Sequence, residues 1–81
     1  MTTKPKDIKL LSNLKVGEKA IVKRISDAWP QLQRKLLTMG IVAGSCVEFV
    51  RTAPLGDPIE VRVLGYNLAL RLAEAEMVEL K

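Results

Sequence analysis

The strictest constraint on the fold is a period-two pattern of apolar and charged side chains over residues 59–63. In this stretch, β-branched residues alternate with charged ones: Ile59, Glu60, Val61, Arg62 and Val63. Such alternation is typical of a strand with one buried face. Pro54 and Pro58 precede it, and because two prolines cannot both lie inside a hydrogen-bonded ladder, the segment between them is expected to reverse the chain. Gly65 ends the strand, and a second alternating segment follows to about Arg71.

The remaining patterns complete a mainly β fold, a small, partly closed β-barrel of about five strands with one inserted helix. Further strands are expected over residues 20–25, 46–53 and 77–80, and short helical turns over residues 11–14 and 72–76. After Pro30, the apolar residues Leu32, Leu36 and Met39 recur at helical spacing. This stripe predicts an amphipathic helix of about ten residues, which Gly40 ends.

Length and composition indicate one small domain. The chain has 81 residues, of which 48% are hydrophobic, so a packed core is expected. We expect the largely polar residues 1–9 to be a flexible N-terminus and residues 10–81 to form the domain. No transmembrane segment or signal peptide is recognisable, so the expected location is the cytoplasm. The net charge of +4 is usual for a solvated surface, and would also suit the anionic inner face of a membrane.

The residue types that carry catalysis and metal binding are scarce. The chain has no histidine and a single cysteine, Cys46. No set of side chains has the spacing of metal ligands or of a nucleophile with its base. Cys46 belongs to an apolar strand, where we expect it to be an inert small hydrophobe. The five glycines are scattered singly rather than gathered into a phosphate-binding loop. We therefore expect no metal site, no cofactor and no enzymatic activity.

Several segments resemble the FeoA family in their order and spacing. They are Leu11-x-x-Leu14-x-x-Gly17, residues 34–41 followed by Gly44, residues 53–59, Gly65-Tyr66-x-Leu68-Ala69-Leu70-Arg71, and residues 73–76 before the last apolar strand. The resemblance covers about residues 11–80. It implies an SH3-like β-barrel and a role in ferrous iron uptake through contact with the cytosolic part of the FeoB transporter. That part carries a G-protein domain, so nucleotide chemistry would belong to the partner.

The reversal between the two prolines has two interpretations. In the first, which we favour, Pro54 and Pro58 make a rigid hairpin end and Leu55 packs back against the barrel. In the second, Leu55 lies at an exposed tip and anchors a partner, since burying a leucine at an interface contributes roughly 1.5–3 kcal/mol. Pro54, Leu55 and Pro58 are therefore candidate partner-binding residues.

Three further residues are candidates for partner contact. Arg62 and Tyr66 are expected to face outward, and both residue types are frequent in interface hot spots. Alternatively, Arg62 pairs with a carboxylate of Glu48 or Glu60, and Tyr66 covers the end of the barrel. Leu37 falls one residue off the apolar stripe of the helix, and we favour its burial in a widened apolar face over exposure.

The sequence is also compatible with functions other than the accessory role. A peptide-binding SH3-like module is the first alternative. Nucleic-acid binding is less expected, because the chain has only Trp29, Phe49 and Tyr66 as aromatic platforms. Weak homo-oligomerisation through unguarded edge strands stays open.

Overall fold

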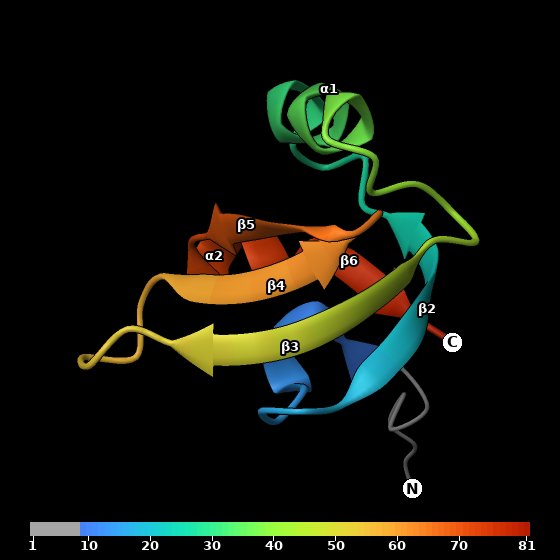
Figure 1. The fold of residues 1–81 in the computed structure, drawn as a ribbon. Coiled ribbons are helices and arrows are strands. Elements are labelled where there is room, and N and C mark those ends of the chain that lie inside the picture. Colours follow the sequence, from blue (N-terminus) through green and yellow to red (C-terminus); the bar gives the residue numbers. More distant parts are fainter. Residues whose placement is uncertain (1–8) are drawn as a thin grey trace, which may run out of the picture.

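A computed structural model describes residues 9–81 (Figure 1). The flexible N-terminus expected from the sequence lies, apart from Lys9, outside the described residues. The fold is mainly β, as predicted. Its strands are β1 (Lys9–Leu10), β2 (Lys19–Ile25), β3 (Cys46–Thr52), β4 (Ile59–Val63), β5 (Tyr66–Leu70) and β6 (Val78–Leu80). Two helices, α1 (Pro30–Thr38) and α2 (Leu72–Ala75), and a 3₁₀ turn (Leu11–Asn13) complete the described part.

The six strands form one antiparallel sheet in the order β1-β6-β2-β3-β4-β5. The sheet is curled but not closed, because β1 and β5 lie at its two ends. Register shifts between Val22 and Arg24 in β2 and between Phe49 and Arg51 in β3 increase its curvature. The partly closed barrel is thus confirmed. The sequence did not predict β1, whose two residues pair with the distant strand β6.

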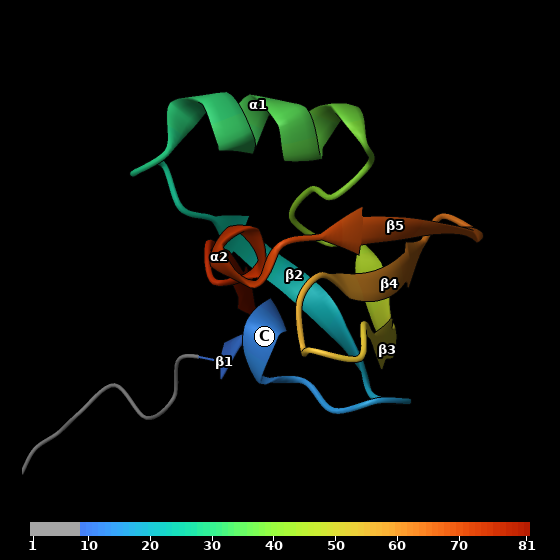
Figure 2. The ribbon, with the colours of Figure 1, turned by 90° about the vertical axis from the view of Figure 1, so that its left-hand side faces the viewer.

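The inserted helix begins at Pro30, as predicted, and lies on one side of the molecule beyond β5 (Figures 1 and 2). Its stripe is confirmed: Leu32 and Leu36 are buried, and Met39 packs against the core. After the helix, Gly40 has a φ of +92°, which glycine adopts at no steric cost. The N–H of Ile41 then donates to the carbonyl of Leu36 at 3.0 Å, and the Ile41 side chain is fully buried.

The core consists of the inward faces of the strands and of side chains from α1, α2, the 3₁₀ turn and the segment after α1. Its fully buried members include Leu11, Val22, Leu36, Ile41, Val47, Val61 and Val78. The alternation predicted for β4 is confirmed, since Ile59, Val61 and Val63 are buried and Arg62 is exposed. No helix within residues 9–81 is long and apolar enough to cross a membrane.

The predicted burial of Leu37 is wrong, and Cys46 does not lie among the apolar side chains of its strand. Leu37 is 46% exposed, because α1 meets the core only along the narrow Leu32–Leu36 stripe, and the next residue lies about 100° farther round the helix. Cys46 is exposed, because Val47 and Phe49 take the inward positions of β3 and period two turns Cys46 outward. Its register partner on β2, Ile21, is exposed as well.

Candidate interaction surfaces

The segment between β3 and β4, residues 53–58, forms a projecting loop that we call the proline loop (Figure 1). Internal hydrogen bonds fix it: the N–H of Ala53 donates to the Pro58 carbonyl at 2.9 Å, and the N–H of Gly56 donates to the Ala53 carbonyl at 2.8 Å. A third bond ties it to α2, where the N–H of Leu72 donates to Oδ1 of Asp57 at 3.0 Å. The loop is therefore a defined structure at the surface.

Leu55 lies at the tip of the proline loop and is 96% exposed. The interpretation that packed Leu55 back against the barrel is thus wrong. The physical reason is the tight turn closed by Ala53 and Gly56, which places Pro54 and Leu55 at its two corners. Pro54 and Pro58 are also exposed. All three candidates from this segment are available for contact.

A shallow pocket of about 360 Å³ opens at the base of the proline loop. Apolar groups of Ala53, Pro54, Pro58 and Ala69 contribute to its lining. The side chains of Arg51 and Glu60 line it as well. The pocket lies directly beside the loop, so a partner that covers Leu55 could extend into it.

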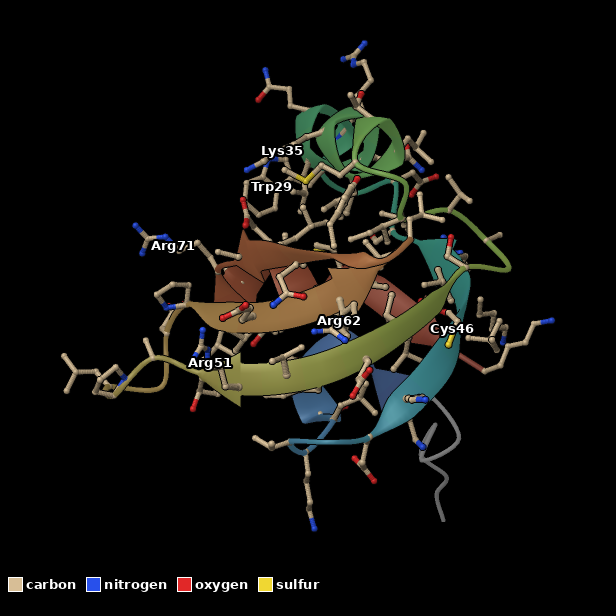
Figure 3. All side chains as sticks on the ribbon, in the orientation of Figure 1. Trp29, Lys35, Cys46, Arg51, Arg62 and Arg71 are labelled. Atoms are coloured by element: carbon tan, nitrogen blue, oxygen red, sulfur yellow. The ribbon has the colours of Figure 1, made fainter. Side chains whose placement is uncertain are left out.

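A chain of polar contacts crosses the outer face of β3, β4 and β5. Nε of Arg51 donates to Oε1 of Glu60 at 2.6 Å, and the amide of Asn67 donates to the other oxygen of Glu60. Nε of Arg62 donates to the side-chain oxygen of Asn67 at 3.0 Å. These donors, Arg51 first, hold the pKa of Glu60 below its usual range. The predicted outward position of Arg62 is observed (Figure 3), but its hydrogen bond goes to an amide rather than to Glu48 or Glu60.

Tyr66 joins the start of β5 to the end of α1. Its hydroxyl donates to the carbonyl of Met39 at 2.7 Å, and its side chain remains 45% exposed. The residue thus combines both interpretations made from the sequence, because it braces the helix end and still presents part of its ring. Trp29, just before α1, is 38% exposed and contributes no side-chain hydrogen bond to the helix start.

Leu64, which the sequence did not mark as a candidate, forms the two-residue turn between β4 and β5 together with Gly65. Leu64 has a φ of +54° and is 73% exposed. This left-handed conformation costs a residue other than glycine, asparagine or aspartate roughly 1–2 kcal/mol. The signal was available, because two alternating strands separated by two residues predict a turn that prefers Asn-Gly or Asp-Gly. A leucine in that position is unusual.

The side chain of Leu64 packs over Gly40 at the end of α1. A Cβ atom added to Gly40 would lie only 2.5 Å from Cδ1 of Leu64, and the Tyr66 hydroxyl would be 3.9 Å away. Leu37 precedes Gly40 by three residues, and its carbonyl accepts the Gly40 N–H at 3.1 Å. We call Leu37, Gly40, Leu64 and Tyr66 the hairpin patch.

The structure therefore divides the candidate residues between the two ends of β4. Pro54, Leu55 and Pro58 lie in the proline loop, where β4 begins, whereas Tyr66 belongs to the hairpin patch, where β4 ends. Leu37 reaches the hairpin patch from α1, and Arg62 lies on β4 between the two groups. Within residues 9–81, no three Cys, Asp or Glu side chains lie together in a group that could hold a metal ion.

Comparison with known proteins connects this architecture to iron transport. The family model of the FeoA domain matches residues 9–81. A protein of Porphyromonas gingivalis, described as a fusion of Fe(2+) transport protein A and the Fe(2+) transporter FeoB, is 34% identical over 71 residues. That match covers 88% of this chain and 8% of the fusion protein. The chain thus spans a small fraction of the length of that relative.

Solved structures of similar proteins share the fold. The solution structure of FeoA from Chlorobium tepidum is 42% identical with a TM-score of 0.83, and the alignment covers 89% of this chain and 68% of that one. A crystal structure of FeoA from Stenotrophomonas maltophilia, complexed with zinc and described as an SH3 domain protein, is 33% identical with a TM-score of 0.81. It covers 90% of this chain and 89% of that one, so the fold here is SH3-like.

Proposed function

Because the chain belongs to the FeoA family, we propose that it is a non-enzymatic accessory protein of ferrous iron uptake. In this proposal it acts by contact with the cytosolic part of a FeoB-type transporter. Iron passage and nucleotide turnover belong to the transporter, and this chain supplies a binding surface that regulates or assembles it.

The main support for the proposal is the Porphyromonas gingivalis protein, in which a related segment and a FeoB transporter form one polypeptide. Fusion holds two modules at a high effective concentration, which favours contact between them. The protein would then work in the cytoplasm, at the inner face of the membrane that holds its partner.

The proline loop offers the surface for this contact. Leu55 is 96% exposed at its tip, and burial of such a side chain in a partner contributes roughly 1.5–3 kcal/mol. The hydrogen bond from Leu72 to Asp57 holds the loop in place before binding. A loop that is already ordered loses less conformational entropy when it binds, so more of the contact energy appears as affinity.

The experiment is a binding measurement between the purified protein and the FeoB-type transporter of the same organism in lipid nanodiscs, with GDP, a GTP analogue or no nucleotide. We expect Leu55→Asp to weaken binding at least tenfold, because a carboxylate would be buried in an apolar contact. Its melting temperature should stay within about 2 °C of the wild type, since the side chain makes little contact with the fold.

The matched control is Val16→Asp, because Val16 is also an exposed apolar residue, 64% exposed, in the turn before β2. Its binding should equal that of the wild type. Absence of wild-type binding in all three nucleotide conditions would refute the direct-contact mechanism. Equal weakening by both variants would show a loss of apolar surface in general rather than a contact at Leu55.

A further inference from the structure

Leu64 holds an unfavourable backbone conformation and gains little burial in return. With a φ of +54° and 73% of its surface exposed, it neither suits its turn nor fills the core. Asparagine at this position would form the preferred Asn-Gly turn and would satisfy the fold at lower cost. Strained residues that the fold does not require are frequent at binding sites.

The neighbours of Leu64 hold it in a fixed position. The absence of a Cβ at Gly40 creates the space that Cδ1 of Leu64 enters. The hydrogen bond from the Tyr66 hydroxyl to the Met39 carbonyl fixes the hairpin against the end of α1. Leu37, 46% exposed, is a further apolar side chain on the last turn of α1, and its carbonyl accepts the Gly40 N–H at 3.1 Å. The hairpin patch is thus an ordered apolar surface before any partner arrives.

The charges around the hairpin patch are mainly positive. On α1, Arg34 lies three residues before Leu37, about one helical turn away, and forms no ion pair within residues 9–81. The charge of Lys35 is balanced by Glu74, so Lys35 does not add to the basic rim of the patch. A shallow hollow of about 160 Å³ beside Leu64 is lined by Lys19 and Arg62. One carboxylate, that of Glu48, also lines this hollow. The surroundings therefore favour a partner that carries carboxylates around an apolar centre.

We propose that the hairpin patch is a second contact surface for the FeoB-type transporter, separate from the proline loop. It would receive a segment of the transporter in which an apolar side chain is flanked by carboxylates. The inference rests on the proposed function, because it names the same partner. A second copy of this chain fits less well, since a two-fold contact would bring the basic rim of one copy against the same rim of the other.

The test uses the nanodisc binding measurement with Leu64→Asn, a change that removes the apolar side chain and suits the turn. We expect affinity to fall at least tenfold while the melting temperature stays equal or rises. This combination separates a contact role from a structural one, because a structural leucine would lower the melting temperature when replaced. Wild-type affinity in Leu64→Asn would refute the proposal.

Charge reversal tests the basic rim. Arg34→Glu should weaken binding at low salt and reduce the dependence of affinity on salt concentration. The control is Lys23→Glu, an exposed change on β2 that should alter affinity less than twofold. If Arg34→Glu and Lys23→Glu weaken binding equally, the basic rim has no specific role in the contact.

The outcomes distinguish this inference from the proposed function. If the wild type binds and Leu55→Asp abolishes binding while Leu64→Asn does not, only the second surface is refuted. If the wild type does not bind at all, the proposed function and the inference both fail. If the wild type dimerises in analytical ultracentrifugation and Leu64→Asn is monomeric, the hairpin patch is a self-association surface instead.

Discussion

Leu64 and Gly40 depend on each other across a turn and a helix end. Each has a positive φ, +54° for Leu64 and +92° for Gly40, and the leucine side chain occupies the space that a side chain at position 40 would need. The effect of a substitution at one position therefore depends on the residue at the other. A substitution at either position changes both a backbone conformation and a contact.

Gly40→Ala should lower the free energy of unfolding by about 1–2 kcal/mol from backbone strain, with a further loss from the clash with Leu64. In the double variant Gly40→Ala/Leu64→Gly the clash is absent, so its loss should be smaller than the sum of the losses of the two single variants. Urea denaturation of the two single variants and the double variant measures this coupling. Strictly additive effects would contradict the close packing of the two residues.

At the scale of elements, single side chains connect segments that are distant in the sequence. Nζ of Lys35 on α1 donates to Oε2 of Glu74 on α2 at 3.1 Å. The other oxygen of Glu74 accepts the N–H of Arg71 at 2.9 Å, just before α2 begins. One carboxylate therefore fixes the start of α2 and links it to α1. Asp57 does the same for the proline loop, through the N–H of Leu72.

The Glu74 contacts predict a dependence of stability on pH. Partial burial raises the pKa of Glu74, but the hydrogen bonds from Arg71 and Lys35, with their charges, outweigh it and lower the pKa. Because the folded state has the lower pKa, this stabilisation is complete above the usual carboxyl range and is lost as the pH falls through the folded pKa. Glu74→Gln should cost about 1 kcal/mol at neutral pH.

The measurement is urea denaturation of the wild type and Glu74→Gln across the acidic range. The difference in unfolding free energy between them should shrink as the pH falls. A difference that stays constant from neutral to strongly acidic pH would show that the carboxylate charge contributes nothing.

Asp57→Ala should loosen the proline loop. Loss of the Leu72 hydrogen bond removes a cap from α2, which costs about 0.5–2 kcal/mol. Hydrogen exchange should become faster in the loop and in the first turn of α2, while the strands β2 and β3 stay protected. Unchanged exchange in both segments would show that the loop is held by its internal bonds alone.

At the scale of the whole molecule, stability depends on a small core shared by the sheet and α1. Two adjacent helix residues test this. Leu36 is fully buried, so Leu36→Ala should cost about 2–5 kcal/mol, a large part of the stability of a domain of this size. Leu37 is 46% exposed, and Leu37→Ala should change stability by less than about 1 kcal/mol. Equal losses measured by urea denaturation would mean that Leu37 belongs to the core after all.

Elements with a regular apolar period could be predicted from the sequence. The alternation in β4 and the Leu32–Leu36 stripe of α1 identify both the element and its buried face, because amphipathicity alone decides them. β1 could not be predicted, since its two residues are a strand only through pairing with β6 at the far end of the chain.

The candidate surfaces were predicted in part. The sequence marked Leu55 and Leu37, but their exposure depends on tertiary packing: the turn and the Asp57–Leu72 bond for the loop, and the position of α1 over the sheet for the helix. For Leu64, the spacing of β4 and β5 indicates a turn with positive φ, but the packing of its side chain over Gly40 depends on the tertiary position of α1 and could not be predicted.

The pairing of β1 with β6 has a topological consequence. Lys9 is the register partner of Leu80, so the polypeptide enters and leaves the folded unit at a single place. Such a unit can be inserted into, or appended to, a longer polypeptide with one short connector and no rearrangement of its interior. The proline loop and the β4–β5 turn belong to strands at the opposite end of the sheet order. A covalent link to another domain at the termini would therefore leave both surfaces free to contact that domain.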